Sequence, residues 1–159
     1  MMKFKTSLKL IRLKKNMVGA TLIEILIAVL ILSFGFLGMA ALQVRAMKGG
    51  ISSFQRTQAV ILSQYMMDVM RVDREAAKSG NYNLALSCNP SGISGTTLAN
   101  NSLKDWLTSV KANIGTADDT YTCAVVTCNA DYICNVRIDW DDRGAGGLRE
   151  QSVEVSSRV

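Results

Sequence analysis

The chain has 159 residues, no histidine and a formal net charge of +5, a length that allows one modest domain and an additional segment. Six of its 18 basic residues and none of its 13 acidic residues lie in residues 1–19, so the rest of the chain is nearly neutral. This distribution excludes the basic surface of a nucleic-acid-binding protein. The absence of histidine excludes histidine-based catalytic triads and most zinc sites that combine histidine with cysteine.

Residues 20–42 form an apolar run directly after the basic leader. Twenty-three residues of helix cross a hydrocarbon core of about 30 Å. Basic residues before such a run favour a cytoplasmic N-terminus. The alternative is an ordinary secretory signal peptide cut after "GMA" at 38–40, but the run is longer than the roughly 7–15 apolar residues of such peptides.

Glu24 is the only charged residue in the apolar run. A charged side chain at the centre of a bilayer costs about 2.5–3.5 kcal/mol. If the leader is removed after Gly19, the new amine of Ala20 lies four residues before Glu24, on the same helical face. The two groups then pair within one chain, or between chains with an axial offset, in which case Glu24 sets the register of a helix assembly. The alternative is an incidental carboxylate that reaches the membrane edge.

One long helix is predicted over residues 20–78. Beyond residue 43, apolar side chains recur at intervals of three, four and seven, which is typical of one helical face, and we expect this face to pack on the following domain. Its members are Met47, Ile51, Phe54, Ile61, Tyr65, Val69, Val72 and Ala76.

A second, shorter helix is predicted over residues 102–115. Residues 79–101 are rich in Ser, Gly and Asn and are predicted to form a loop. Ser102 is the expected cap, with Asp105 three residues later, and Gly115 is the expected stop. The apolar face of this helix consists of Leu103, Trp106, Leu107 and Val110.

The remainder predicts an antiparallel sheet of three or more strands. Residues 121–127 and 132–140 are rich in β-branched and aromatic residues, and 148–156 alternates after the turn sequence "DDRGAGG". In 132–140, alternate residues from Tyr132 to Trp140 are apolar, as in a half-buried strand. The predicted fold class is therefore α+β, with a long N-terminal helix followed by a small antiparallel sheet domain.

All four cysteines follow the apolar run, and an even number in an exported domain predicts two disulfides. Three pairings of the four cysteines are possible, and spacing does not choose among them. We expect Cys88 to bond to Cys123 or to Cys134, with the other two cysteines closing within the sheet. A zinc site built from all four is the alternative, but 34, four and five residues separate successive cysteines, unlike typical zinc-ligand spacing.

Other motifs give weaker signals. Asp139, Asp141 and Asp142 resemble part of a calcium loop, but three carboxylates are too few for that ion, and a hairpin turn is the simpler interpretation. Trp106 and Trp140 are expected to anchor the core. The sequence contains no nucleophile paired with a base, no phosphate loop and no metal motif, so we expect neither enzymatic activity nor a cofactor.

The N-terminal residues resemble a known signal. "GATLIE", residues 19–24, is similar to the type III signal of type IV prepilins. The resemblance implies that a prepilin peptidase cuts between Gly19 and Ala20 and methylates the new Ala20 amine, and that Glu24 guides assembly. The segments "EILIAVLILSFGFLGMAALQVRAMKG" and "QAVILSQYMMDVMRVDREAA" resemble the PilV family of minor pilins.

The resemblance implies a domain plan and a set of partners. Residues 1–19 form the leader, 20–42 the transmembrane half of the helix, 43–78 its amphipathic half, and 79–159 a disulfide-bonded periplasmic β domain. The implied location is the inner membrane, with a cytoplasmic N-terminus, and then the pilus. The implied partners are other minor and major pilins, the prepilin peptidase and the inner-membrane assembly platform, with roles in fimbrium biogenesis, priming, twitching or adhesion. The alternatives are a type II secretion pseudopilin and, from a different class, a membrane-tethered periplasmic enzyme.

Overall fold

The structure, a computed structural model, describes residues 19–116 and 118–159. The predicted leader lies outside these residues except for Gly19. The chain divides into two compact units between Ala40 and Ala41, and each is described by itself.

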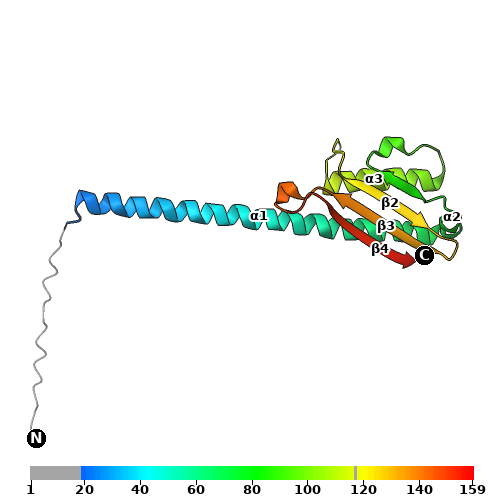
Figure 1. The fold of residues 1–159 in the computed structure, drawn as a ribbon, viewed down its shortest axis with the longest axis horizontal. Coiled ribbons are helices and arrows are strands. Elements are labelled where there is room, and N and C mark those ends of the chain that lie inside the picture. The colour runs from blue at the N-terminus through cyan, green and yellow to red at the C-terminus, as the bar shows by residue number, and fades with distance from the viewer. Residues whose placement is uncertain (1–18, 117) are drawn as a thin grey trace, which may run out of the picture. The chain divides into compact units, whose positions relative to one another are not determined.

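The N-terminal helix α1 spans Leu22–Val72 and is followed by the short helix α2, Arg74–Lys78 (Figure 1). The prediction of one uninterrupted helix to residue 78 is therefore wrong at Asp73, whose φ of −114° and ψ of 55° leave the helical region. The hydroxyl of Tyr82 donates to the Asp73 carboxylate at 3.2 Å, which gives this residue a partner outside the helix.

Four antiparallel strands follow, in the order β1-β2-β3-β4, so the predicted α+β fold is confirmed. The last three agree with the predicted strands to within a few residues: β2 is Cys123–Cys128, β3 is Ile133–Trp140 and β4 is Gln151–Arg158. The strand β1, Leu84–Ser87, lies in the segment predicted to be loop. It was missed because it is only four residues long and its pairing with β2 contains an irregularity.

The helix α3 spans Leu98–Ile114 and ends at Gly115, the predicted stop. Its predicted start at Ser102 is wrong, because the cap is Thr97, whose hydroxyl accepts a hydrogen bond from Asn100 N at 3.2 Å. Two short 3-10 turns complete the described chain: η1, Pro90–Gly92, and η2, Arg143–Ala145.

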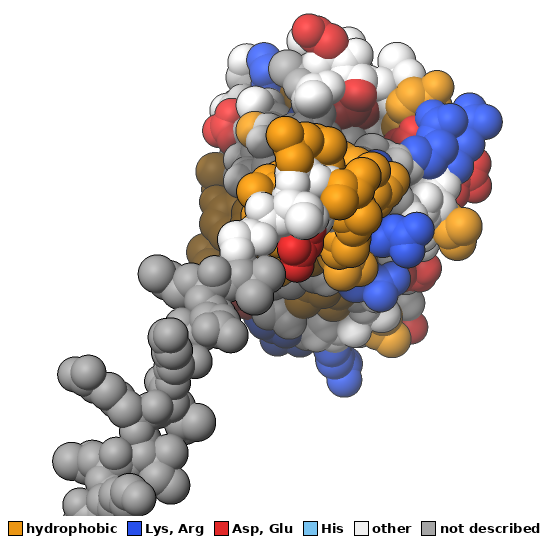
Figure 2. Space-filling model, turned by 90° about the vertical axis from the view of Figure 1, so that its left-hand side faces the viewer, with side chains coloured by type: hydrophobic (Ala, Val, Ile, Leu, Met, Phe, Trp, Pro, Cys, Tyr) orange, Lys and Arg blue, Asp and Glu red, His pale blue; other side chains and the backbone are white. Residues whose placement is uncertain are grey.

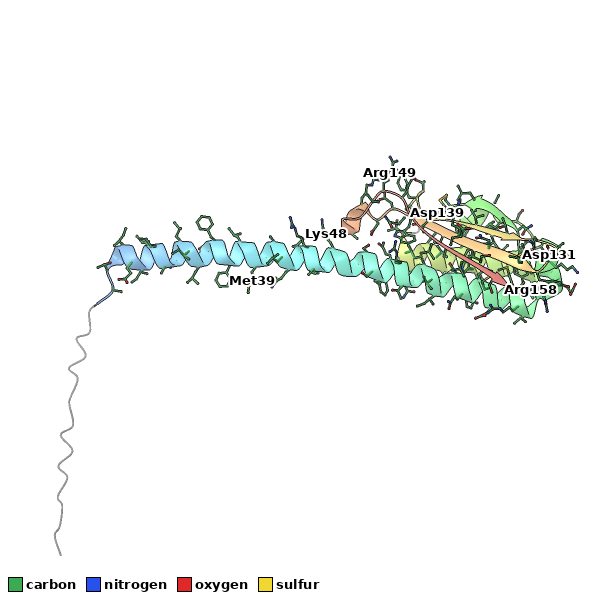
Figure 3. The ribbon with its side chains drawn as sticks, turned by 60° about the horizontal axis from the view of Figure 1, so that its bottom comes forward. Met39, Lys48, Asp131, Asp139, Arg149 and Arg158 are labelled. Atoms are coloured by element: carbon green, nitrogen blue, oxygen red, sulfur yellow. A yellow bond between two sulfur atoms is a disulfide. The ribbon has the colours of Figure 1, made fainter. Side chains whose placement is uncertain are left out.

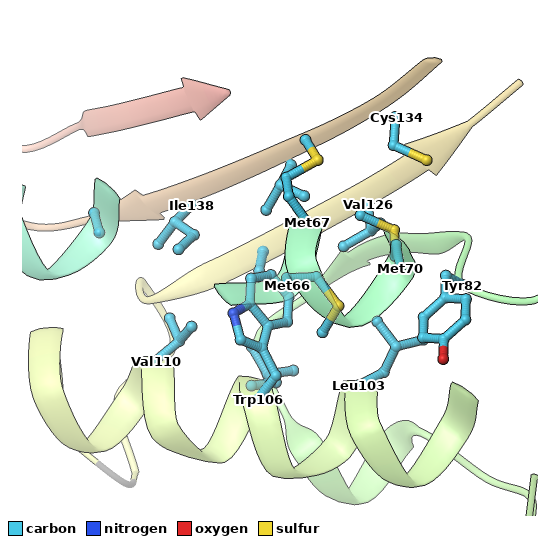
Figure 4. Close-up of a cluster of buried hydrophobic side chains, with 14 of the residues drawn as sticks. Met66, Met67, Met70, Tyr82, Leu103, Trp106, Val110, Val126, Cys134 and Ile138 are labelled. Atoms are coloured by element: carbon cyan, nitrogen blue, oxygen red, sulfur yellow. The ribbon is translucent and has the colours of Figure 1, made fainter. Parts of the chain in front are cut away.

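The core lies between the inner face of the sheet and the two helices α1 and α3 (Figure 4). The predicted apolar faces of α3 and β3 are buried in it, and both tryptophans are core residues as expected. The indole N–H of Trp106 donates to the Leu62 carbonyl at 2.9 Å, which fixes α3 against α1. Each fully buried large side chain contributes roughly 1.5–3 kcal/mol, so α3 is an integral part of this domain.

The side of α1 that meets this core is not the predicted one. Its buried residues are Ala59, Ser63, Met66, Met67 and Met70, whereas most of the predicted face is exposed. Ile61, Tyr65 and Val72 each follow a buried residue by two positions, a rotation of about 200° around the helix. The three methionines are flexible enough to fill the irregular space between α1, the sheet and α3. We call the exposed set the outer stripe: Met47, Ile51, Phe54, Ile61, Tyr65 and Val72.

The cysteines form the disulfides Cys88–Cys123 and Cys128–Cys134. Of the two pairings that the sequence left open, Cys88 therefore takes Cys123, and the second bridge closes the β2–β3 hairpin. Each bridge restricts the unfolded chain and typically adds about 2–4 kcal/mol to the free energy of unfolding.

A buried lysine supports the first disulfide. Lys111, only 3% exposed, donates through Nζ to the carbonyls of Cys88 at 2.8 Å and Asp119 at 2.5 Å. Burial acts to raise the pKa of Asp119, but hydrogen bonds from the backbone N–H groups of Thr122, Thr116 and Tyr121 outweigh it and lower the pKa below its usual value. Asp119 is thus ionised near neutral pH, and its Oδ1 lies 3.8 Å from the Lys111 ammonium.

Replacing this lysine should destabilise the domain. The change Lys111→Met leaves two carbonyl acceptors without their charged donor, and we expect the free energy of unfolding to fall by about 2–3 kcal/mol. Urea unfolding of the oxidised chain measures the effect. Lys104→Met is the matched control on the same helix, because Lys104 is exposed and its loss should change stability by less than about 0.5 kcal/mol. Equal midpoints for the two variants would contradict the structural role of Lys111.

Candidate assembly interface

The start of α1 is capped by its own residues. The Glu24 N–H points to Thr21, with 3.1 Å to the carbonyl oxygen and 3.4 Å to the hydroxyl oxygen. Thr21 and Glu24 have the spacing of a capping box, in which a threonine side chain satisfies an N–H of the first turn. Glu24 also lies in the first turn, where the helix dipole favours a negative charge. The carboxylate is therefore compatible with helix formation but is exposed in the isolated chain.

Gly19 and Ala20, the predicted cleavage and methylation positions, precede α1 and are exposed. An added Cβ at Gly19 would meet nothing within 4 Å among the described residues. Among the described residues, nothing in the fold therefore requires glycine at this position.

The first half of α1 exposes apolar side chains on every side within its own unit. Figure 2 looks toward the N-terminal end of the helix and shows hydrophobic side chains gathered there. By length and composition, this helix can cross a membrane. A surface of this kind requires either lipid or other helices around it.

The outer stripe extends the exposed apolar surface of α1 beyond the predicted transmembrane segment. It runs from Met47 to Val72, roughly 37 Å at about 1.5 Å per residue, with its members at intervals of three, four and seven on one helical face. Figure 3 shows side chains standing out from α1 along this part of the helix. The stripe has a sharp polar border on one side, formed by Ser53, Thr57, Gln64 and Asp68, all of them exposed.

The aspartates of the turn do not converge on a metal. Asp139 lies 3.2 Å from Arg137 Nε, Asp141 pairs with Arg143 at 2.5 Å, and Asp142 accepts a hydrogen bond from Ser52 Oγ at 2.6 Å. The hydrogen bond from the Arg143 side chain holds the pKa of Asp141 below its usual range. Within the described ranges, no group of three potential ligands could hold a metal ion.

The connection between β3 and β4 differs in two ways from the hairpin turn that the sequence predicts. Asp142 is buried, and its bond to Ser52 ties the β3–β4 connection to α1. The connection also contains η2 and so is longer than a tight turn. The contact between Ser52 and Asp142 has no local signal, because the two residues lie 90 residues apart.

No protein-family model, curated protein or solved structure significantly matches the chain.

The structure thus leaves the candidate residues in two groups. Gly19, Ala20 and Glu24 lie at the start of α1, and the outer stripe lies on its second half. The stripe is the part of the interface that sequence reasoning assigned wrongly. Both the buried set and the stripe have helical spacing, so the local pattern of α1 gave no signal for choosing between them.

Proposed function

We propose that the chain is a minor type IV prepilin, similar to the PilV family, and that it becomes a subunit of a fibre built by helix packing. In this proposal α1 is first inserted in the inner membrane, with a cytoplasmic N-terminus and a periplasmic sheet domain. A prepilin peptidase then removes the leader after Gly19. The assembly platform finally transfers the subunit into a pilus beside other minor and major pilins.

The observation that carries this proposal is the length of apolar surface on α1. A membrane anchor needs an apolar surface only within the bilayer. The outer stripe continues for a further 25 residues or so, on the side of α1 opposite to the domain core. Exposed apolar surface of this extent favours a second helix as the partner, because apolar residues at intervals of three, four and seven lie on one helical face and pack against a matching face.

The N-terminal geometry adds two supporting arguments. The fold gives no reason for a glycine at position 19, and recognition of this residue by a peptidase would explain its presence. After cleavage, the Ala20 amine of one subunit and Glu24 of a neighbour form an ion pair between helices. In an apolar surrounding such a pair selects one axial offset, because a buried charge without its partner is strongly unfavourable.

Leader removal is the first test. When the chain is produced with an active prepilin peptidase, we expect the membrane form to begin at Ala20 and to carry one methyl group on its amine. Intact-mass and N-terminal peptide analysis measure both. Gly19→Leu should leave α1 intact, since a side chain there meets open space, but it should block cleavage. A wild-type chain that remains uncut, or that begins at Ala41, would contradict the proposal.

A further inference from the structure

The two edges of the sheet differ in how they are protected. The strand β1 is four residues long and carries an irregular pairing, both of which discourage further strand addition. The strand β4 is eight residues long, pairs with β3 in continuous register and contains neither proline nor lysine. Among the described strands, none pairs with its other side. An open edge of this kind is a template for another extended chain.

The backbone groups on the open edge follow from the register. Val159 N–H donates to the Tyr132 carbonyl at 2.8 Å, and these two residues are direct partners in the register that joins Ile133 to Arg158. In an antiparallel pair, bonded and non-bonded partners alternate. The bonded residues of β4 therefore have odd numbers. The N–H and C=O groups that point away from β3 belong to Ser152, Glu154, Ser156 and Arg158.

The hydrogen bonds between β3 and β2 lead to the same assignment of bonded and outward-pointing residues in β4. Asn129 N–H donates to the Ile133 carbonyl at 3.0 Å, so the odd-numbered residues of β3 bond to β2. Its even-numbered residues must then bond to β4, and the register pairs them with odd-numbered residues of β4. Two independent hydrogen bonds thus define the same open row of donors and acceptors.

The surroundings of this edge define the side chains that an added strand would meet. On the inner side, a groove between β4 and α1 is lined by Gln64, Met67, Asp68 and Arg71, a mostly polar surface. On the outer side, the exposed residues of β4 include one acid, Glu154, and one base, Arg158. Figure 3 labels Arg158 at the end of this strand. A partner strand with a base opposite Glu154 and an acid opposite Arg158 matches these charges.

We propose that the open edge of β4 binds an extended segment of a partner protein, which adds to the sheet as a fifth, antiparallel strand with complementary charges. A second copy of this chain is the other candidate. Two copies that pair their β4 strands antiparallel are related by a two-fold axis, which reverses the direction of one α1 relative to the other. Helices inserted in one membrane from the same side cannot take that arrangement. This last step rests on the proposed membrane anchoring.

The probe for the experiment is a peptide with the sequence of β4 itself, QSVEVSSRV, residues 151–159. In antiparallel pairing with Ser156 opposite its own copy, the arginine of the peptide lies opposite Glu154 and its glutamate opposite Arg158. A free peptide has no α1, so the limit that one membrane sets on the direction of a second helix does not apply to it. The matched control, QSVRVSSEV, exchanges the two charges and places like charges opposite each other.

Hydrogen exchange at single amides of the full oxidised chain, in detergent micelles, tests the inference. Without peptide, the amides of Ser152, Glu154 and Ser156 should exchange at least about tenfold faster than those of Val153, Val155 and Ser157. QSVEVSSRV should slow the first group by about tenfold or more, and QSVRVSSEV should bind at least about fivefold more weakly. Ser156→Pro should abolish the protection and Ser156→Thr should retain it, because proline removes an N–H only from the open edge.

Three results would overturn the inference. Equal protection of both groups without peptide would show that the edge is covered. No protection by QSVEVSSRV at millimolar concentration, with the alternation present, would show that the edge does not accept a strand. A dimer in sedimentation velocity that protects the same amides would assign the edge to a second copy. If the proline variant does not fold, amide exchange of the wild-type chain with and without QSVEVSSRV decides whether the edge binds a strand. None of these measurements involves pili, so their failure leaves the proposed function to its own tests.

Discussion

A single acidic substitution in the outer stripe, Phe54→Glu or Ile61→Glu, should remove the protein from pili while its domain stays folded. Both side chains are exposed in the isolated chain, so the free energy of unfolding should change by less than about 0.5 kcal/mol. In a packed helix seam the new carboxylate loses water without gaining a partner. A cost similar to the roughly 2.5–3.5 kcal/mol of a charge inside an apolar helix corresponds to about a hundredfold weaker association.

The measurement is the ratio of this protein in sheared pili to that in membranes, compared with wild type. Thr57→Glu is the matched control, because Thr57 lies on the polar border of the same helix and is also exposed. It should incorporate within about twofold of wild type. Normal incorporation of both stripe variants would show that the stripe does not meet another helix in the fibre.

Glu24→Ala should leave insertion and leader removal intact and should strongly reduce incorporation. Removing a charge from an apolar helix makes insertion easier by up to roughly 3 kcal/mol, and the proposed cleavage site after Gly19 is untouched. The Ala20 amine of a neighbouring subunit then enters the fibre core without its counter-ion, and no polar pair fixes the axial offset of the two helices. Glu24→Gln should fail nearly as completely, since it retains the shape of the side chain but not its charge.

The control for this pair is Ser33→Ala on the same half of α1. The Ser33 hydroxyl donates to the Val29 carbonyl at 2.7 Å, so it is satisfied within the helix, and its loss should leave incorporation unchanged. Wild-type ratios for both Glu24 variants would show that the carboxylate has no part in setting the register of the helices.

The sequence predicted the elements whose signal is local. The alternation of β3, the apolar face of α3 and the stop at Gly115 each depend on residues within one element, and the structure has all three. The cap of α3 was placed five residues too late, because Thr97 and Ser102 are both acceptable capping residues and the structure uses Thr97. The short strand β1 exists only through its pairing with β2.

Long-range contacts explain the remaining differences. The periodicity of α1 contains two seams, one through Ala59, Ser63, Met66 and Met70 and one through the outer stripe. Both have helical spacing, so periodicity alone cannot say which one meets the sheet. The bond from Lys111 to the Cys88 carbonyl is likewise not visible in the local sequence, because the two residues lie 23 positions apart.

Site-specific photocross-linking in assembled pili tests the central claim most directly, namely that the outer stripe meets another pilin helix. Benzoylphenylalanine replaces Phe54, and the adducts are mapped by mass spectrometry. We expect adducts with the N-terminal helix of a neighbouring pilin subunit, and we expect the same probe at Thr127, exposed on the sheet, to give no adduct with that helix. Adducts at position 54 with lipid alone, or with no pilin helix in intact fibres, would contradict the account.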